Sequence, residues 1–135
     1  MYRILLPLDD SNERAKRQAT YVTDLPCAAE DVDAVLAHSL TEEEQTAPDA
    51  MQSIDRVETV RTARDILEGA GVDVDTRELS SPPADGIISL AGSEDFDEIV
   101  MGGRKRSPAE KAILGSATQT VVLNADVPVT VTGGE

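Results

Sequence analysis

The chain has 135 residues and a formal net charge of −14, and 40% of its residues are hydrophobic whereas only 2% are aromatic. This length suits a single domain with one core, residues 1–135, and hydrophobic residues in periodic segments exclude a disordered acidic chain. The single cysteine, Cys27, excludes an intrachain disulfide, and the acidity with so few aromatic side chains argues against binding to nucleic acid.

The first segment, "MYRILLPLDDS", is a nearly continuous apolar run that ends in charged residues. Such a run predicts a central strand at 2–8 that is buried on both faces of a sheet. The charges come too early for a signal peptide or a membrane span, so we expect a cytoplasmic protein without membrane contact. Asp10 should then cap a helix that includes Glu13 and stops before Pro26.

The rest of the chain alternates between strand and helix periodicity. Strands are predicted at 32–40, 72–77, 97–103 and 128–132, and helices at 51–67, from 82–83 onward and at 116–123, with a helical turn at 107–110. Polar residues alternate with apolar ones in 72–77, so this strand should lie at a sheet edge or have one wet face. Gly69 and Gly71 should close the helix 51–67. The alternation predicts an α/β fold with a parallel sheet covered by helices on both faces.

The loops at 9–11 and 102–104 follow the two most buried predicted strands. In parallel sheets, ligands bind beyond the carboxyl ends of the strands where the strand order changes direction, so we expect these loops to face each other there. Gly102 would let the backbone turn sharply and approach a ligand, and the start of the helix at 116 would offer amides to an anion. The alternative is that Gly102 and Gly103 form only a tight turn and that Gly115 merely separates two helical pieces.

Residues 101–116, "MGGRKRSPAEKAILGS", gather positive charge in an otherwise acidic chain. Four bases, Arg104, Lys105, Arg106 and Lys111, stand against one acid, Glu110, which gives a local net charge of +3. These bases either contact a phosphate or pair with nearby carboxylates, and surface pairs contribute only ~0–1 kcal/mol each.

The order and spacing of these features resemble the universal stress protein family along the entire chain. Nucleotide-binding members of that family carry Gly, two residues, Gly, nine residues, and then Gly followed by Ser or Thr, and Gly102, Gly115 and Ser116 stand at matching positions. Asp9 matches an Asp that contacts the nucleotide, and "VMGGRKRSP…LGSATQTVVLNADVPVTV" is similar to the C-terminal signature of the family.

The resemblance implies a five-stranded, doubly wound parallel sheet of strand order 3-2-1-4-5, which is Rossmann-like or adenine nucleotide alpha hydrolase-like. It implies binding of ATP or another adenine nucleotide, with Mg²⁺ as a companion of ATP. The implied nucleotide-binding residues are Pro7, Asp9, Ser39, Gly102, Arg104, Lys105, Gly115, Ser116 and Ala117. It also implies a homodimer that pairs through residues 127–132, Val127 to Thr132, an uncharged edge strand.

The sequence departs from the family pattern at Lys105, which occupies the place of the second motif glycine. Lys105 either obstructs a pocket built for glycine or swings out to meet a phosphate as a point charge.

Three single residues allow a functional and a structural interpretation. Asp9 could accept hydrogen bonds from a nucleotide or cap the following helix, and we favour the ligand role because Asp10 can also cap. His38 is expected to be a hydrogen-bonded core residue. Cys27 has no companion His or basic neighbour that would activate it and is expected to have no role. No order of Ser, His and Asp suggests a hydrolase, so the sequence predicts no catalytic residue.

The favoured function is a small stress-response protein that binds an adenine nucleotide as a sensor or adaptor. The alternatives are a nucleotide-free dimeric adaptor and a slow ATPase or phosphotransferase, for which Asp9 is the only obvious carboxylate. The spread acidity further suggests a salt-accumulating microbe as the source, since concentrated salt screens self-repulsion.

Overall fold

The computed structural model describes residues 1–39, 57–80, 82–103 and 115–133. Its strands are β1 Tyr2–Leu8, β2 Val32–His38, β3 Asp73–Glu78, β4 Glu98–Gly102 and β5 Val129–Thr132. Its helices are α1 Asn12–Thr23, α2 Ala28–Asp31, α4 Glu58–Gly69, α5 Pro83–Ser93 and α6 Ser116–Asn124. All neighbouring strands pair in parallel in the order β3-β2-β1-β4-β5. The predicted fold class and strand order are confirmed.

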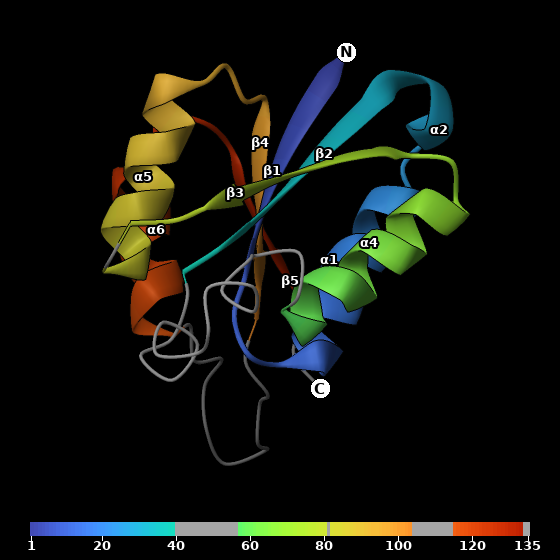
Figure 1. Ribbon diagram of the computed structural model, residues 1–135. Helices are drawn as coiled ribbons and strands as arrows, with labels where there is room; N and C mark the ends of the chain where they lie inside the picture. The colour runs from blue at the N-terminus through green and yellow to red at the C-terminus, as the bar shows by residue number, and fades with distance from the viewer. Residues whose placement is uncertain (40–56, 81, 104–114, 134–135) are drawn as a thin grey trace.

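The sheet lies between two layers of helices, with α1 and α4 on one face and α5 and α6 on the other (Figure 1). Because side chains alternate along a strand, β1 supplies both cores. Ile4 and Leu6 pack with the α1 and α4 side, whereas Leu5 packs with the α5 and α6 side. This arrangement explains the continuous apolar run of the first strand, since neither face of a central strand meets water.

The start of α1 corrects the prediction of an Asp cap. The N-cap is Ser11, whose Oγ accepts a hydrogen bond of 3.3 Å from the backbone N–H of Arg14. Asp10 lies one residue too early for this bond, and its carboxylate lies 3.9 Å from the guanidinium of Arg14 instead. The helix therefore begins at Asn12, one residue later than an Asp10 cap requires.

Three other boundaries differ from the predictions or refine them. The strand β2 ends at His38, and the short helix α2 that precedes it was not predicted. The helix α4 reaches Gly69, and Gly71 then adopts a φ of +83°, which confirms the predicted glycine-rich end. The prediction of one helix over 51–67 is wrong at its start, because Val57 is the extended N-cap of α4 and the helix begins at Glu58. Residues 51–56 and the predicted turn at 107–110 lie outside the described residues.

The two edges of the sheet differ in charge. The edge strand β3 reads DVDTRE, whereas the other edge strand, β5, reads VTVT. The edge position predicted for the alternating segment 72–77 is confirmed. Across the described parts of the chain, no helix is long and apolar enough to cross a membrane.

Candidate functional site

A cavity of about 240 Å³ opens at the carboxyl ends of β1 and β4. The register between these strands comprises Ile4 with Glu98 and Leu5 with Ile99, although β1 continues to Leu8 and β4 to Gly102. The residues that line the cavity come from both sheet ends and from the flanking helices: Pro7, Leu8, Asp9, Asp10, Gln18, His38, Ser39, Leu79, Pro83, Ile87, Met101, Gly102, Ala117 and Thr118. The cavity therefore lies where the strand order changes direction, as the sequence predicts for a ligand site.

The structure brings five of the nine predicted site residues to this cavity. They are Pro7, Asp9, Ser39, Gly102 and Ala117. Gly115 and Ser116 are the N-cap and first residue of α6, next to the cavity-lining Ala117. Arg104 and Lys105, and with them Arg106 and Lys111 of the positive segment, lie outside the described residues.

The carboxylate of Asp9 is held in place by hydrogen bonds from Ser11 and Arg14. Its Oδ1 accepts a hydrogen bond of 2.9 Å from the backbone N–H of Ser11, and its Oδ2 accepts one of 2.7 Å from Nε of Arg14. The hydroxyl of Thr59 in α4 donates to the backbone oxygen of Asp9 at 2.8 Å. Each carboxylate oxygen has a second lone pair, and the side chain is 53% exposed, so Asp9 can still accept hydrogen bonds from a ligand.

His38 is buried and ties the ends of β1 and β2 together. Its Nδ1 lies 2.9 Å from the backbone oxygen of Leu8, its register partner in β1. A carbonyl oxygen can only accept, so Nδ1 carries the hydrogen. This contact agrees with the predicted core role, and the ring lines the cavity as well.

The two glycines at the end of β4, Gly102 and Gly103, are needed for packing. A Cβ on Gly102 would lie 3.0 Å from Cβ of Arg14 and 3.2 Å from Oε1 of Gln18, both on α1. A Cβ on Gly103 would lie 2.2 Å from the backbone oxygen of Thr132 in β5. Gly102 is the last residue of β4, and neither glycine has a positive φ, so a left-handed backbone is not the reason for glycine at these two positions. Close approach of α1 and β5 to the end of β4 is what requires glycine here.

The first turn of α6 presents backbone amides beside the cavity. Gly115 is its N-cap and has no side chain to cap these amides, and Ala117 and the buried Thr118 line the cavity. The first amides of a helix have no intrahelical acceptor and lie at the positive end of the helix dipole. This edge of the cavity can therefore hold an anion.

Sequence reasoning missed the side chains that make the cavity floor and its apolar wall. The wall includes Leu79, Ile87 and Met101, which belong to the core on the α5 and α6 side. The floor includes Gln18, which is 1% exposed. A signal for Gln18 existed, because it shares the buried face of α1 with Ala15, Ala19 and Val22, and a polar residue on an apolar stripe is unusual.

The described residues do not group three His, Cys, Asp or Glu side chains in a way that could hold a metal ion. Asp9 and Asp10 both line the cavity, and the guanidinium of Arg14 lies 2.7 Å and 3.9 Å from their respective carboxylates. This cation competes with a metal ion for the same oxygens.

These features define a small α/β protein with a ligand-sized crevice at the switch point of a parallel 3-2-1-4-5 sheet. The chain belongs to the universal stress protein family, whose family model matches residues 1–133. A universal stress protein of Methanocaldococcus jannaschii is 34% identical over 74 residues, which cover 55% of this chain and 44% of that protein. The chain spans about half the length of the curated relatives it matches.

Solved structures share the fold over nearly the full chain. A universal stress protein from Archaeoglobus fulgidus is 28% identical with a TM-score of 0.77, and the match covers 98% of this chain and 99% of that one. The A. fulgidus universal stress protein in complex with dAMP is 24% identical, with a TM-score of 0.73 and 98% of both chains covered. More distant members were solved with cAMP, at 18% identity and a TM-score of 0.71, and, from Arabidopsis thaliana, with AMP, at 15% and 0.70. These two matches cover 99% and 100% of this chain, and 98% and 93% of the other chains.

Proposed function

We propose that this protein binds an adenine nucleotide in the crevice between β1 and β4 and acts as a stress-response sensor or adaptor. The observation that carries the proposal is the convergence of Pro7, Asp9, Ser39, Gly102 and Ala117 on one cavity at the switch point. Family structures solved with dAMP, cAMP and AMP support the choice of an adenine nucleotide as the ligand.

The chemistry of the cavity suits the parts of such a ligand. The apolar wall around Ile87 and Met101 offers a surface for a flat base, and Asp9 offers an acceptor for a ribose hydroxyl. The phosphates would then lie toward the first amides of α6, at Ser116 and Ala117. With ATP as the ligand, Mg²⁺ would be held mainly by the phosphates, since Arg14 already lies against Asp9.

A cavity-filling substitution tests the proposal. Calorimetric titration of the wild type in molar salt with AMP and with ATP should show saturable binding. Ala117→Leu should abolish this binding, because the added atoms enter the cavity, whereas Ala70→Leu, at the exposed end of α4, should not.

The variant Lys105→Gly separates the two interpretations of Lys105, since tighter binding by this variant means that Lys105 obstructs the pocket. Absence of binding by the wild type and by Lys105→Gly would favour the nucleotide-free adaptor.

We also propose that the protein forms a symmetric homodimer through β5 and the residues just before it, 127–132. An exposed edge strand with unpaired backbone groups invites pairing, and charged side chains commonly protect such edges. The edge strand β3 carries Asp73, Asp75, Arg77 and Glu78, whereas β5 carries only valine and threonine, and its first three residues are half-buried.

Light scattering in molar salt measures this association directly. The wild type should have the mass of a dimer, and Val131→Lys, which places a charge on β5, should be a monomer. Asp75→Lys places the same charge on the opposite edge and should remain a dimer. A monomeric wild type would refute the interface.

A further inference from the structure

The floor of the crevice contains one buried amide that joins the two strands as they separate. Gln18 lies on α1, and its Nε2 is 2.7 Å from the backbone oxygen of Pro7 in β1 and 2.9 Å from that of Val100 in β4. Both acceptors are carbonyl oxygens, so the group that faces them must be the amide nitrogen, and each of its two hydrogens serves one strand.

These two carbonyls lie beyond the paired part of β1 and β4. The last register pair of these strands is Leu5 with Ile99, so Pro7 and Val100 need partners from elsewhere. Proline has no N–H, which leaves only the carbonyl to satisfy at position 7. A buried carbonyl without a partner is costly, and one glutamine side chain supplies both missing donors.

The same side chain also borders the site on its other side. A Cβ at Gly102 would lie 3.2 Å from Oε1 of Gln18, so the amide oxygen occupies the space that a side chain at position 102 would need. Gln18 thus bonds to the backbone of Pro7 and Val100 and fills the space beside Gly102, and both Pro7 and Gly102 line the cavity together with Gln18 itself.

We infer that Gln18 is the positioning residue of the crevice: its amide sets the separation of the carboxyl ends of β1 and β4 and thereby the affinity for the ligand. The part of this inference that concerns ligand affinity rests on the proposed function. The residue acts through the backbone of both strands, so its loss changes the shape of the site and not only the stability of the fold.

Gln18→Met tests this inference, because methionine keeps the length of the side chain and removes both donors. Val22→Ala is the matched control, since Val22 is fully buried on the same helix but packs in the core away from the cavity. At a temperature where both variants are folded, Gln18→Met should weaken AMP binding about tenfold, because ligand binding must then also restore the separation of the strand ends that the two hydrogen bonds hold in the wild type. Val22→Ala should lower the melting temperature and leave the AMP affinity unchanged.

Hydrogen exchange provides a readout that needs no ligand. In Gln18→Met, the segments Leu6–Leu8 and Val100–Gly102 should exchange faster than in Val22→Ala, whereas the opposite end of β1 should not differ. If the wild type binds no AMP, the proposed function fails and exchange alone decides the role of Gln18. Affinity and exchange equal to those of Val22→Ala would overturn the inference.

Gln18→Glu provides a second variant if Gln18→Met does not fold. It keeps the shape of the side chain but places a carboxylate against two carbonyl oxygens, so it should show the same local exchange and loss of affinity. Failure of both variants to fold would also overturn the inference, because the amide would then be required for the fold as a whole.

Discussion

At the residue scale, the shape of the crevice depends on the missing side chain at position 102. Gly102→Ala forces a Cβ to within 3.0 Å of Cβ of Arg14, which belongs to the packed helix α1 and cannot swing away. We expect a loss of about 1–3 kcal/mol in the free energy of unfolding, as for other overpacked positions. Gly92→Ala is the matched control, because no atom lies within 4 Å of its new Cβ and alanine favours the helix. Urea unfolding of both variants checks this, and equal stability would contradict it.

A second residue-scale prediction concerns Tyr2 in alkaline solution. Tyr2 is 41% exposed, but partial desolvation of its hydroxyl and the hydrogen bond of 2.9 Å to Glu98 raise its pKa to about 12. In the unfolded chain a tyrosine titrates near ~10, so the folded protein holds this proton more tightly. The contribution of protonated Tyr2 to the stability of the fold is therefore complete below pH ~10 and is lost as the pH rises toward 12.

Tyrosinate absorbance and thermal melts check this prediction for Tyr2. The wild type should show a tyrosine that ionises near pH 12, and this step should be absent in Tyr2→Phe. The melting temperature of the variant should depend less on pH in this range. A step near pH 10 that Tyr2→Phe removes would contradict the prediction.

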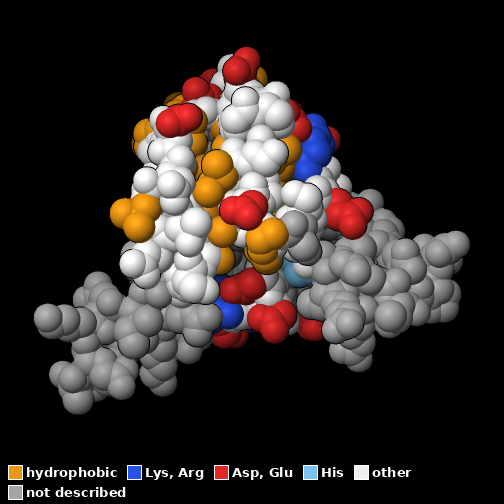
Figure 2. Space-filling model, turned by 90° about the vertical axis from the view of Figure 1, so that its left-hand side faces the viewer, with side chains coloured by type: hydrophobic (Ala, Val, Ile, Leu, Met, Phe, Trp, Pro, Cys, Tyr) orange, Lys and Arg blue, Asp and Glu red, His pale blue; other side chains and the backbone are white. Residues whose placement is uncertain are grey.

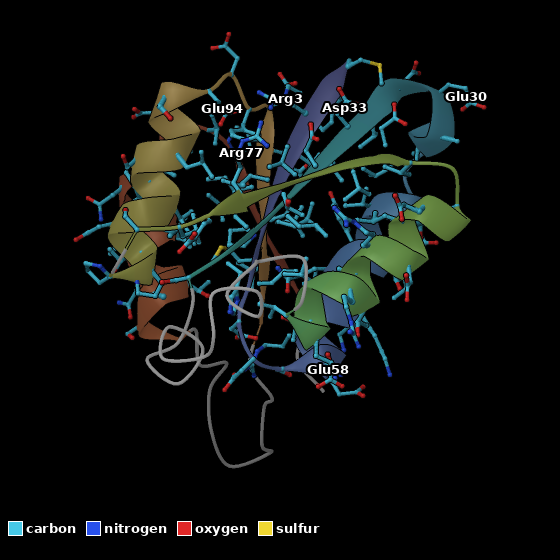
Figure 3. The ribbon with its side chains drawn as sticks, in the orientation of Figure 1. Arg3, Glu30, Asp33, Glu58, Arg77 and Glu94 are labelled. Atoms are coloured by element: carbon cyan, nitrogen blue, oxygen red, sulfur yellow. The ribbon has the colours of Figure 1, made fainter. Side chains whose placement is uncertain are left out.

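At the scale of elements, the carboxylate of Glu94 joins α5, β3 and β1 at the end of the sheet opposite the crevice. Glu94, at the end of α5, lies 3.1 Å from Nε of Arg77 in β3 and 3.0 Å from Nη2 of Arg3 in β1. In Figure 3 the side chains of Glu94, Arg77 and Arg3 point toward one another, whereas Glu30 lies away from them. The hydrogen bonds from Arg77 and Arg3 hold the pKa of Glu94 below its ordinary value of 4.5.

Glu94→Gln should therefore destabilise the protein at neutral pH by up to about 1 kcal/mol, and less in molar salt, since the pairs are partly exposed. Because the folded pKa is depressed, the stabilisation is present above pH 4.5 and is lost as the pH falls through the folded pKa. Wild type and variant should accordingly converge in acid. Glu30→Gln removes the same charge from the exposed helix α2 and should have little effect. Chemical unfolding at several pH values measures the difference, and equal effects of the two substitutions would refute the role of the network.

Also at this scale, the elements were predictable where their signal is local. The apolar run of β1, the alternation in β3 and the proline at the start of α5 depend on consecutive residues, and all three elements occur as expected. The cap of α1 was less predictable, because Asp10 and Ser11 are both good N-cap residues. Contact of Asp10 with Arg14 and the backbone geometry of Ser11 decide between them.

At the scale of the whole molecule, surface charge should govern stability. The net charge is −14, and Figure 2 shows acidic side chains spread over the face covered by α5 and α6, among exposed hydrophobic ones. Salt screens repulsion between such charges, so the melting temperature should rise from low to molar KCl. Sucrose, which is excluded from protein surfaces but carries no charge, is the control. An equal rise in both cosolutes, or no rise in salt, would contradict the hypothesis that the surface is adapted to concentrated salt.

The candidate site was predictable in part. Asp9 and Gly102 could be placed at the crevice because the carboxyl ends of parallel strands lie at one edge of the sheet, whereas Ser39 was predicted from the family resemblance. The wall residue Leu79 could not, because no motif marks it, and it reaches the cavity only through the packing of the layer that contains α5 and α6.

The sequence by itself determined the α/β class, the family and the end of the sheet where a ligand would bind, because hydrophobic periodicity and glycine spacing are properties of neighbouring residues. Only the tertiary structure decided what the site residues touch. Arg14 bonds to Asp9 within one loop and helix. Gln18, however, donates a hydrogen bond to Val100 across 82 positions of the chain, and Gly103 packs closely against Thr132 of another strand. Such contacts depend on how the layers pack, since a side chain finds a distant backbone only after the sheet and its helices have assembled.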